Sequence, residues 1–168
     1  NKETLANVYE ALGESEYKRA GQAGYKLAIE SLTKALQIRE TKEYFDKKKL
    51  KKTYRLLAFT YLSLGLQVLK SSEFLNKAKD LMQDGNEELK ELAEINFYLG
   101  LTSFWRGLKG IGRWGESNPK LLEGDDCDIF DYALKHFGEA YEILSKIVGK
   151  IHPEMNKLKH YIQETTYS

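Results

Sequence analysis

Few residues in this chain have the type and spacing that catalysis or metal binding requires. The histidines are His136, His152 and His160, and the single cysteine is Cys127. No histidine has a ligand-spaced histidine or cysteine partner, and a lone cysteine can form neither an internal disulfide nor a zinc motif. We also find no serine–histidine–aspartate arrangement, no nucleotide-binding fingerprint and no paired carboxylates beside an evident cleft. We therefore expect a protein that is not an enzyme and that uses no metal or cofactor.

Two charged segments have simple structural explanations. The acidic residues of 123–131, EGDDCDIFD, lack the ordered spacing of a calcium loop, and we expect them to cap a helix. The basic run 46–55, DKKKLKKTYR, is typical of a solvated helix face, with an anionic partner as the alternative. Basic groups are slightly unfavourable near a helix start, so we expect nearby acids such as Glu40 or Glu43 to hold them.

A glycine-rich segment stands out in the second half of the chain. Residues 105–124, WRGLKGIGRWGESNPKLLEG, hold five glycines, both tryptophans and one of the two prolines. The glycines do not follow the spacing of a phosphate-binding loop. Two interpretations stay open: the segment packs on the protein's own helices, or it contacts a partner or ligand. The second interpretation would use Trp105, Arg106, Arg113 and Trp114.

The periodicity of apolar residues predicts an all-α fold. These residues recur at steps of three and four, which is the helical period, and no stretch alternates as a strand would. With 168 residues, 42% of them hydrophobic and 30% charged, the composition is typical of one soluble globular domain. We expect helices at about 3–20, 22–40, 44–66, 69–84, 87–107, 128–149 and 153–165.

Two kinds of helix alternate along the chain. One kind carries Leu-Gly near its middle or end, at 12–13, 64–65 and 99–100. The other carries a small residue, a large one four positions on, and alanine three further on. Its three examples are Ala28–Leu32–Ala35, Ser71–Leu75–Ala78 and Ala133–Phe137–Ala140. Small residues let two helices approach closely, so we expect antiparallel helix pairs that stack side by side.

This pattern resembles the tetratricopeptide repeat family, in which aromatic-x-x-Leu-Gly on one helix precedes Ala-x-x-x-Phe-x-x-Ala on the next. The best single match is YKLAIESLTKALQI, residues 25–38, and the resemblance covers about residues 5–147. It implies a short α-solenoid of three helix pairs plus a C-terminal capping helix. All 168 residues would then form one domain, with an insertion at about 107–125. The proline that usually closes each repeat is missing here.

The resemblance also implies where a partner would bind, because this family uses the concave groove lined by its first helices. Counting from the Leu-Gly pairs places mainly apolar residues there. Three alternatives stay open: these residues are ordinary core, the chain covers them with its own insertion or last helix, or they form an open groove. With the insertion, the candidate contacts are Tyr17, Phe59, Leu62, Leu66, Phe97, Leu101, Phe104, Trp105, Arg113 and Trp114.

These observations predict a non-enzymatic interaction module that binds a protein or peptide in an apolar groove. The alternative is a carrier or transport-accessory protein that encloses an apolar small molecule with the groove and the tryptophan segment. The net charge of +1 gives no support for nucleic acid binding. No apolar run is long enough for a membrane span. The compartment stays open between the cytoplasm and, if the N-terminus is processed, a bacterial envelope.

Overall fold

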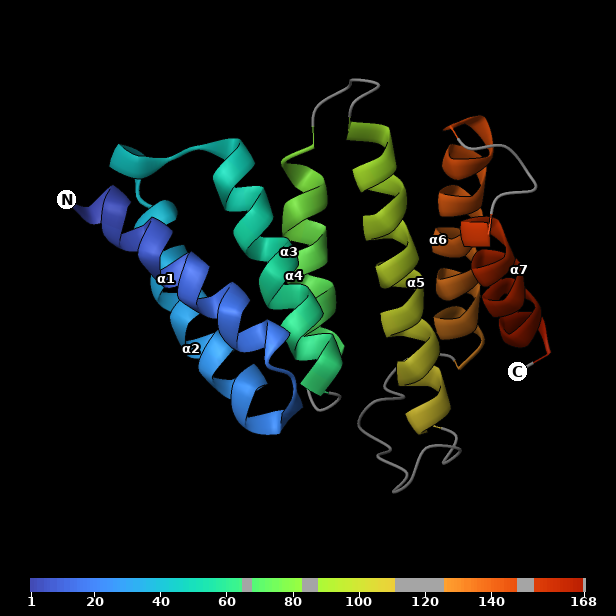
Figure 1. Cartoon of the computed structure of the whole chain (residues 1–168). Helices are drawn as coiled ribbons and strands as arrows, with labels where there is room; N and C mark the ends of the chain where they lie inside the picture. The colour runs from blue at the N-terminus through green and yellow to red at the C-terminus, as the bar shows by residue number, and fades with distance from the viewer. Residues whose placement is uncertain (65–67, 83–87, 111–125, 148–152, 168) are drawn as a thin grey trace. The chain divides into compact units, whose positions relative to one another are not determined.

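The structure is a computed structural model, and it describes residues 1–64, 68–82, 88–110, 126–147 and 153–167. The all-α prediction is confirmed for these residues, which form seven α-helices and one short 3₁₀ helix (Figure 1). The elements are α1 (Lys2–Lys18), α2 (Gly21–Arg39), η1 (Lys42–Tyr44), α3 (Lys47–Leu64), α4 (Val68–Asp80), α5 (Leu89–Gly110), α6 (Asp126–Ile147) and α7 (Pro153–Thr166).

Several helix ends differ from the sequence prediction; for example, α4 ends at Asp80, four residues before the predicted end. Helix α3 begins at Lys47 rather than near residue 44, because the carboxylate of Asp46 accepts a hydrogen bond of 3.0 Å from the backbone N–H of Lys49. Such a cap fixes a helix start. Helix α5 continues to Gly110, three residues further than predicted. The insertion predicted at about 107–125 therefore starts inside a helix, and residues 111–125 lie outside the described residues.

The helices pack mainly against their neighbours in the chain and form two compact units, residues 1–82 and residues 83–168. In the first unit α1 pairs with α2, α3 pairs with α4, and α2 also packs on α3. In the second unit α5 pairs with α6, and α7 packs on α6. Sequential helix pairs followed by one further helix were predicted, and this arrangement is confirmed. That all residues form a single domain stays a prediction.

Each unit has a pair in which a glycine of the first helix faces a large side chain of the second. A Cβ added at Gly100 of α5 would lie 2.5 Å from Cδ1 of Phe137 on α6. A Cβ added at Gly13 of α1 would lie 2.6 Å from Cγ of Leu32 on α2. Phe137 and Leu32 are both fully buried. The predicted close approach of paired helices at small residues is therefore present in both pairs.

A buried polar network connects the three helices α1, α2 and α3. Arg39, at the end of α2, is only 4% exposed and donates to the carboxylate of Glu10 on α1. The Arg39 guanidinium also donates to the hydroxyl of Thr53 on α3 at 2.7 Å and to Oδ1 of Asn7 at 2.9 Å. A buried charge is stable only when it is paired and hydrogen-bonded, so this network fixes how the three helices meet.

The basic run at the start of α3 is held by acids of α1. Nζ of Lys49 lies 2.6 Å from Glu3, and Nζ of Lys52 lies 2.7 Å from Glu14 and 3.3 Å from Glu10. The hydrogen bond from Lys52 to Glu14 raises the pKa of the Lys52 ammonium above its usual value. These charges therefore join two helices that are distant in sequence.

For Lys49 and Lys52, the acids are those of α1 rather than the predicted Glu40 or Glu43. Glu40 instead accepts a hydrogen bond of 2.7 Å from the hydroxyl of Tyr54. Burial and this bond raise the pKa of the Tyr54 phenol. Glu43 lies beside Tyr44 and raises the pKa of that phenol through a hydrogen bond. Proximity in sequence favoured Glu40 and Glu43, but the packing of α1 on α3 brings other carboxylates closer to the lysines.

Helix α7 covers the core of the second unit. Its stripe was predicted to be Met155, Leu158, Tyr161 and Ile162, and all four pack into that core. Met155 and Leu158 are almost fully buried. The Tyr161 ring stacks on Phe137 with 5.7 Å between ring centroids. The apolar face of α7 therefore completes the core built by α5 and α6.

The close approach at Gly100 predicts an opposite response of two helical glycines to alanine. Gly100→Ala would force its methyl group against the Phe137 ring and should lower the free energy of unfolding by about 1–3 kcal/mol. Gly138→Ala has no heavy atom within 4 Å of the new Cβ and should raise it by about 0.5–1 kcal/mol through helix propensity. Urea denaturation measures both changes, and a stabilised Gly100→Ala variant would contradict the packing.

The buried network predicts a large effect at Arg39. Arg39→Met keeps a long side chain but leaves the buried Glu10 carboxylate without its guanidinium, and it should lower the free energy of unfolding by about 3 kcal/mol. Arg19→Met is the control, because Arg19 is 71% exposed and lies 3.4 Å from Glu16; its effect should stay below about 1 kcal/mol. Equal losses in urea denaturation would show that the network contributes little.

Candidate functional site

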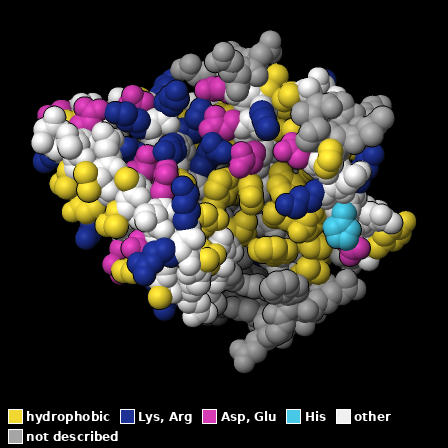
Figure 2. Space-filling model, viewed as in Figure 1, with side chains coloured by type: hydrophobic (Ala, Val, Ile, Leu, Met, Phe, Trp, Pro, Cys, Tyr) yellow, Lys and Arg dark blue, Asp and Glu magenta, His cyan; other side chains and the backbone are white. Residues whose placement is uncertain are grey.

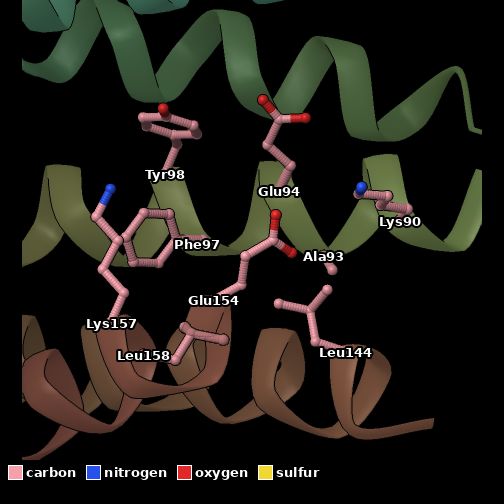
Figure 3. A pocket seen from close by; sticks show the side chains of 9 residues that line it. All are labelled: Lys90, Ala93, Glu94, Phe97, Tyr98, Leu144, Glu154, Lys157 and Leu158. Atoms are coloured by element: carbon pink, nitrogen blue, oxygen red, sulfur yellow. The ribbon is translucent and has the colours of Figure 1, made fainter. Parts of the chain in front are cut away.

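The candidate site is an open pocket of about 200 Å³ in the second unit (Figure 3). It lies where the first half of α5 meets the end of α6 and the start of α7. Its lining residues are Lys90, Ala93, Glu94, Phe97, Tyr98, Leu144, Glu154, Lys157 and Leu158.

The helical period places both an apolar floor and a charged rim in this pocket. On α5, Ala93 and Phe97 are four residues apart and therefore share one face of the helix. On α7, Leu158 follows Glu154 by four residues, so both lie on the side that faces the pocket. Pro153 opens α7 at the first helical position, where proline is tolerated.

The floor of the pocket is apolar and belongs to the core. Ala93 is fully buried, Leu158 is 2% exposed and Leu144 is 8% exposed. Phe97 is half-buried and packs on this core; its ring lies 5.9 Å from that of Phe137. Part of an aromatic ring is thus left accessible above a closed apolar surface, which is the kind of surface that binds an apolar side chain.

The rim carries charges of both signs. Lys90 and Lys157 are exposed at the pocket, as is Glu154, and Glu94 is partly exposed. Nζ of Lys157 lies 5.9 Å from the centroid of the Phe97 ring, within the range of a cation–π contact. Figure 3 shows Lys157 running beside Phe97 and Glu154 rising from α7 toward α5. A bound segment could therefore pair with either sign of charge around an apolar centre.

Of the residues predicted for the site on α5, only Phe97 lines this pocket. Leu101 and Phe104 are 6% and 7% exposed and belong to the core. The Phe104 ring contacts Tyr161 of α7 at a centroid distance of 5.9 Å, so the last helix covers it. Trp105 is partly buried against the same core. Leu101 and Phe104 therefore offer little surface to a partner, whereas Trp105 is half-buried and does not line the pocket.

The candidate residues of the first unit are engaged in contacts within that unit. Tyr17 is half-buried, with its ring 5.6 Å from that of Tyr25 and its hydroxyl 3.4 Å from Oγ of Ser63. Leu62 is buried, and the half-buried Phe59 lies under the guanidinium of Arg55 at 5.7 Å.

Leu66, Arg113 and Trp114 lie outside the described residues, as do most residues of the glycine-rich segment. Their predicted contacts stay predictions.

Sequence reasoning missed the residues that α6 and α7 contribute to the pocket. Leu144, Glu154 and Lys157 belong to no Leu-Gly helix, so counting from the repeat pattern could not find them. The available signal was the amphipathic stripe of α7, which predicted a docked helix but not where it would dock.

Among the residues that the structure describes, the remaining histidines and acids form no second site. His136 is buried, with Nδ1 3.1 Å from Oδ1 of Asn96 and its ring 4.4 Å from that of Tyr132, as expected of a packing residue. Among the described residues, no group of three or more histidine, cysteine or acidic side chains could hold a metal ion. No helix in the described part of the chain is long and apolar enough to cross a membrane.

The chain matches no model of a known protein family and no curated protein sequence. Comparison therefore leaves the family unidentified.

The burial of Phe104 and Phe97 on α5 predicts which of the two rings contributes more to stability. Phe104→Ala removes a ring that is 7% exposed and should lower the free energy of unfolding by about 3–5 kcal/mol. Phe97→Ala should lower it by clearly less, because part of that ring already faces solvent. Thermal and urea unfolding compare the two variants, and equal losses would mean that Phe97 is core rather than a pocket wall.

Proposed function

We propose that this chain is a non-enzymatic protein–protein interaction module that binds a partner segment at the pocket between α5, α6 and α7. The observation that carries the proposal is the accessible Phe97 ring above an apolar floor, bordered by Lys157 and Glu154. An apolar anchor surrounded by a polar rim is the usual anatomy of a protein interface.

The pocket size favours a peptide segment over an enclosed small molecule. Small-molecule sites usually have volumes of about 300–1,000 Å³ and bury most of the ligand. This pocket has about 200 Å³ and opens to solvent, so it suits one aliphatic or aromatic side chain of a partner. Trp105 does not line it, which removes one support for the alternative of an apolar-ligand carrier.

We also propose that the helix pairs follow the tetratricopeptide plan. Support comes from Gly13 facing Leu32 and Gly100 facing Phe137, the positions at which the repeat pattern requires a small and a large residue. The full burial of Ala28 and Ala133, one turn before those large residues, also supports it. On this proposal the pocket is formed where the closing helix α7 meets the last pair.

The binding proposal is tested by selecting peptides from a random display library on the immobilised protein. Selected peptides should share one large apolar residue with charged neighbours, because the floor and the rim require both. Glu154→Lys and Lys157→Glu change only exposed side chains and should weaken binding of a selected peptide at least about tenfold, or 1.4 kcal/mol.

Lys159→Glu is the matched control for this measurement. Lys159 is exposed on α7 and does not line the pocket, so peptide binding should stay unchanged. Recovery of no common motif, or equal binding by all three variants, would refute the site.

A further inference from the structure

The first unit has an exposed apolar stripe, which is separate from the pocket of the second unit. Leu5, Val8 and Leu12 on α1 are 43%, 56% and 47% exposed, and Leu27 on α2 is 47% exposed. The spacing of three and four residues on α1 places its members along one side of that helix. Figure 2 shows hydrophobic side chains at the surface over the α1–α2 pair, at the left of the view.

The leucines of the two helices lie on the same edge of this pair. Leu12 directly precedes Gly13, and Leu27 directly precedes Ala28, whose carbonyl oxygen lies 3.4 Å from the Cβ position of Gly13. Gly13 and Ala28 face each other, and the two helices run antiparallel. The residue that precedes each of them, Leu12 or Leu27, therefore points to the same side of the helix pair. We call Leu5, Val8, Leu12 and Leu27 the α1–α2 edge.

Helix α3 occupies the opposite side of the pair. Glu10 and Glu14 of α1 bind Lys52 of α3. Leu12 is two residues from each of these acids. At about 100° per residue it therefore lies on nearly the opposite side of α1. The α1–α2 edge is therefore the face of the pair that no described helix of the first unit covers.

In the second unit, an additional helix covers the apolar face of the helix pair. There α7 covers the last pair, burying Met155 and Leu158 while it exposes polar residues outward. Stacked helix pairs need a polar outer face at each end, and exposed apolar surface of this kind marks an interaction site. The α1–α2 edge is the corresponding apolar face of the first unit, and no described helix of that unit covers it.

The charged side chains of α1 and α2 indicate what kind of partner would bind at the edge. Exposed basic side chains of α1 and α2 exceed the available acids once the Arg19–Glu16 pair is set aside, because Glu3 is bound to Lys49 and only Glu30 is otherwise exposed. Nζ of Lys34 lies 5.5 Å from the Tyr9 ring, beside the leucines. The exposed lysines of the two helices are Lys2, Lys18, Lys26 and Lys34.

We propose that the α1–α2 edge docks an amphipathic helix of a partner protein whose leucine stripe is flanked by acidic residues. The helix would occupy the place that α7 occupies in the second unit, with its acids on the lysines around the edge. A second copy of the chain would bring two basic edges together, so charge disfavours it. The proposal is independent of the pocket on α5.

Two synthetic helical peptides with the same leucines at positions i, i+3 and i+7 test the proposal. One carries glutamates and the other lysines on both flanks, and fluorescence anisotropy measures their binding to the full chain at low salt. The glutamate peptide should bind at least about tenfold more tightly than the lysine peptide. Leu12→Glu should abolish binding, and Lys34→Glu should reduce the preference for the glutamate peptide.

Leu69→Glu is the control, because Leu69 of α4 is 52% exposed but lies outside the edge. It should leave binding unchanged, and circular dichroism verifies that each variant is folded. Equal binding of the two peptides, or an unaffected Leu12→Glu variant, would overturn the proposal. So would a wild-type dimer that Leu12→Glu dissociates in sedimentation, or binding to anionic lipid vesicles that Leu12→Glu abolishes.

Discussion

The structure depends on the close approach of paired helices at a glycine. At Gly100 and Gly13 the missing side chain leaves room for Phe137 and Leu32, and a Cβ at either glycine would overlap the facing side chain. Such contact allows the large residue to be fully buried, which is where most of the favourable free energy of helix packing arises. The orientation of each pair then determines which side chains face outward.

The contact within a helix pair does not determine how a third helix packs against that pair. The two units use chemically different contacts for this third helix. In the first unit, Arg39 joins α1, α2 and α3 through Glu10 and Thr53, so buried charge specifies the contact. In the second unit α7 docks through the buried side chains of Met155 and Leu158, so apolar burial specifies the contact. Polar contacts require matched geometry, whereas apolar contacts tolerate more variation.

The pocket follows directly from the docking of α7. This helix buries its apolar stripe, but its first turn stays far enough from α5 to leave Phe97 partly accessible above Leu158. The charged residues that alternate with the stripe, Glu154 and Lys157, then form the rim. The same amphipathic pattern that stabilises the unit therefore also creates its candidate binding surface.

The sequence by itself determined the helices, their pairing and the apolar stripe of α7, because these follow from local periodicity and from small residues at fixed spacing. Only the tertiary structure decided that Phe104 and Leu101 are core while Phe97 is accessible. It also decided that Lys52 pairs with Glu14 rather than with an acid nearby in sequence. Burial and ion pairing depend on which helices become neighbours, and a repeat pattern of single helices does not contain that information.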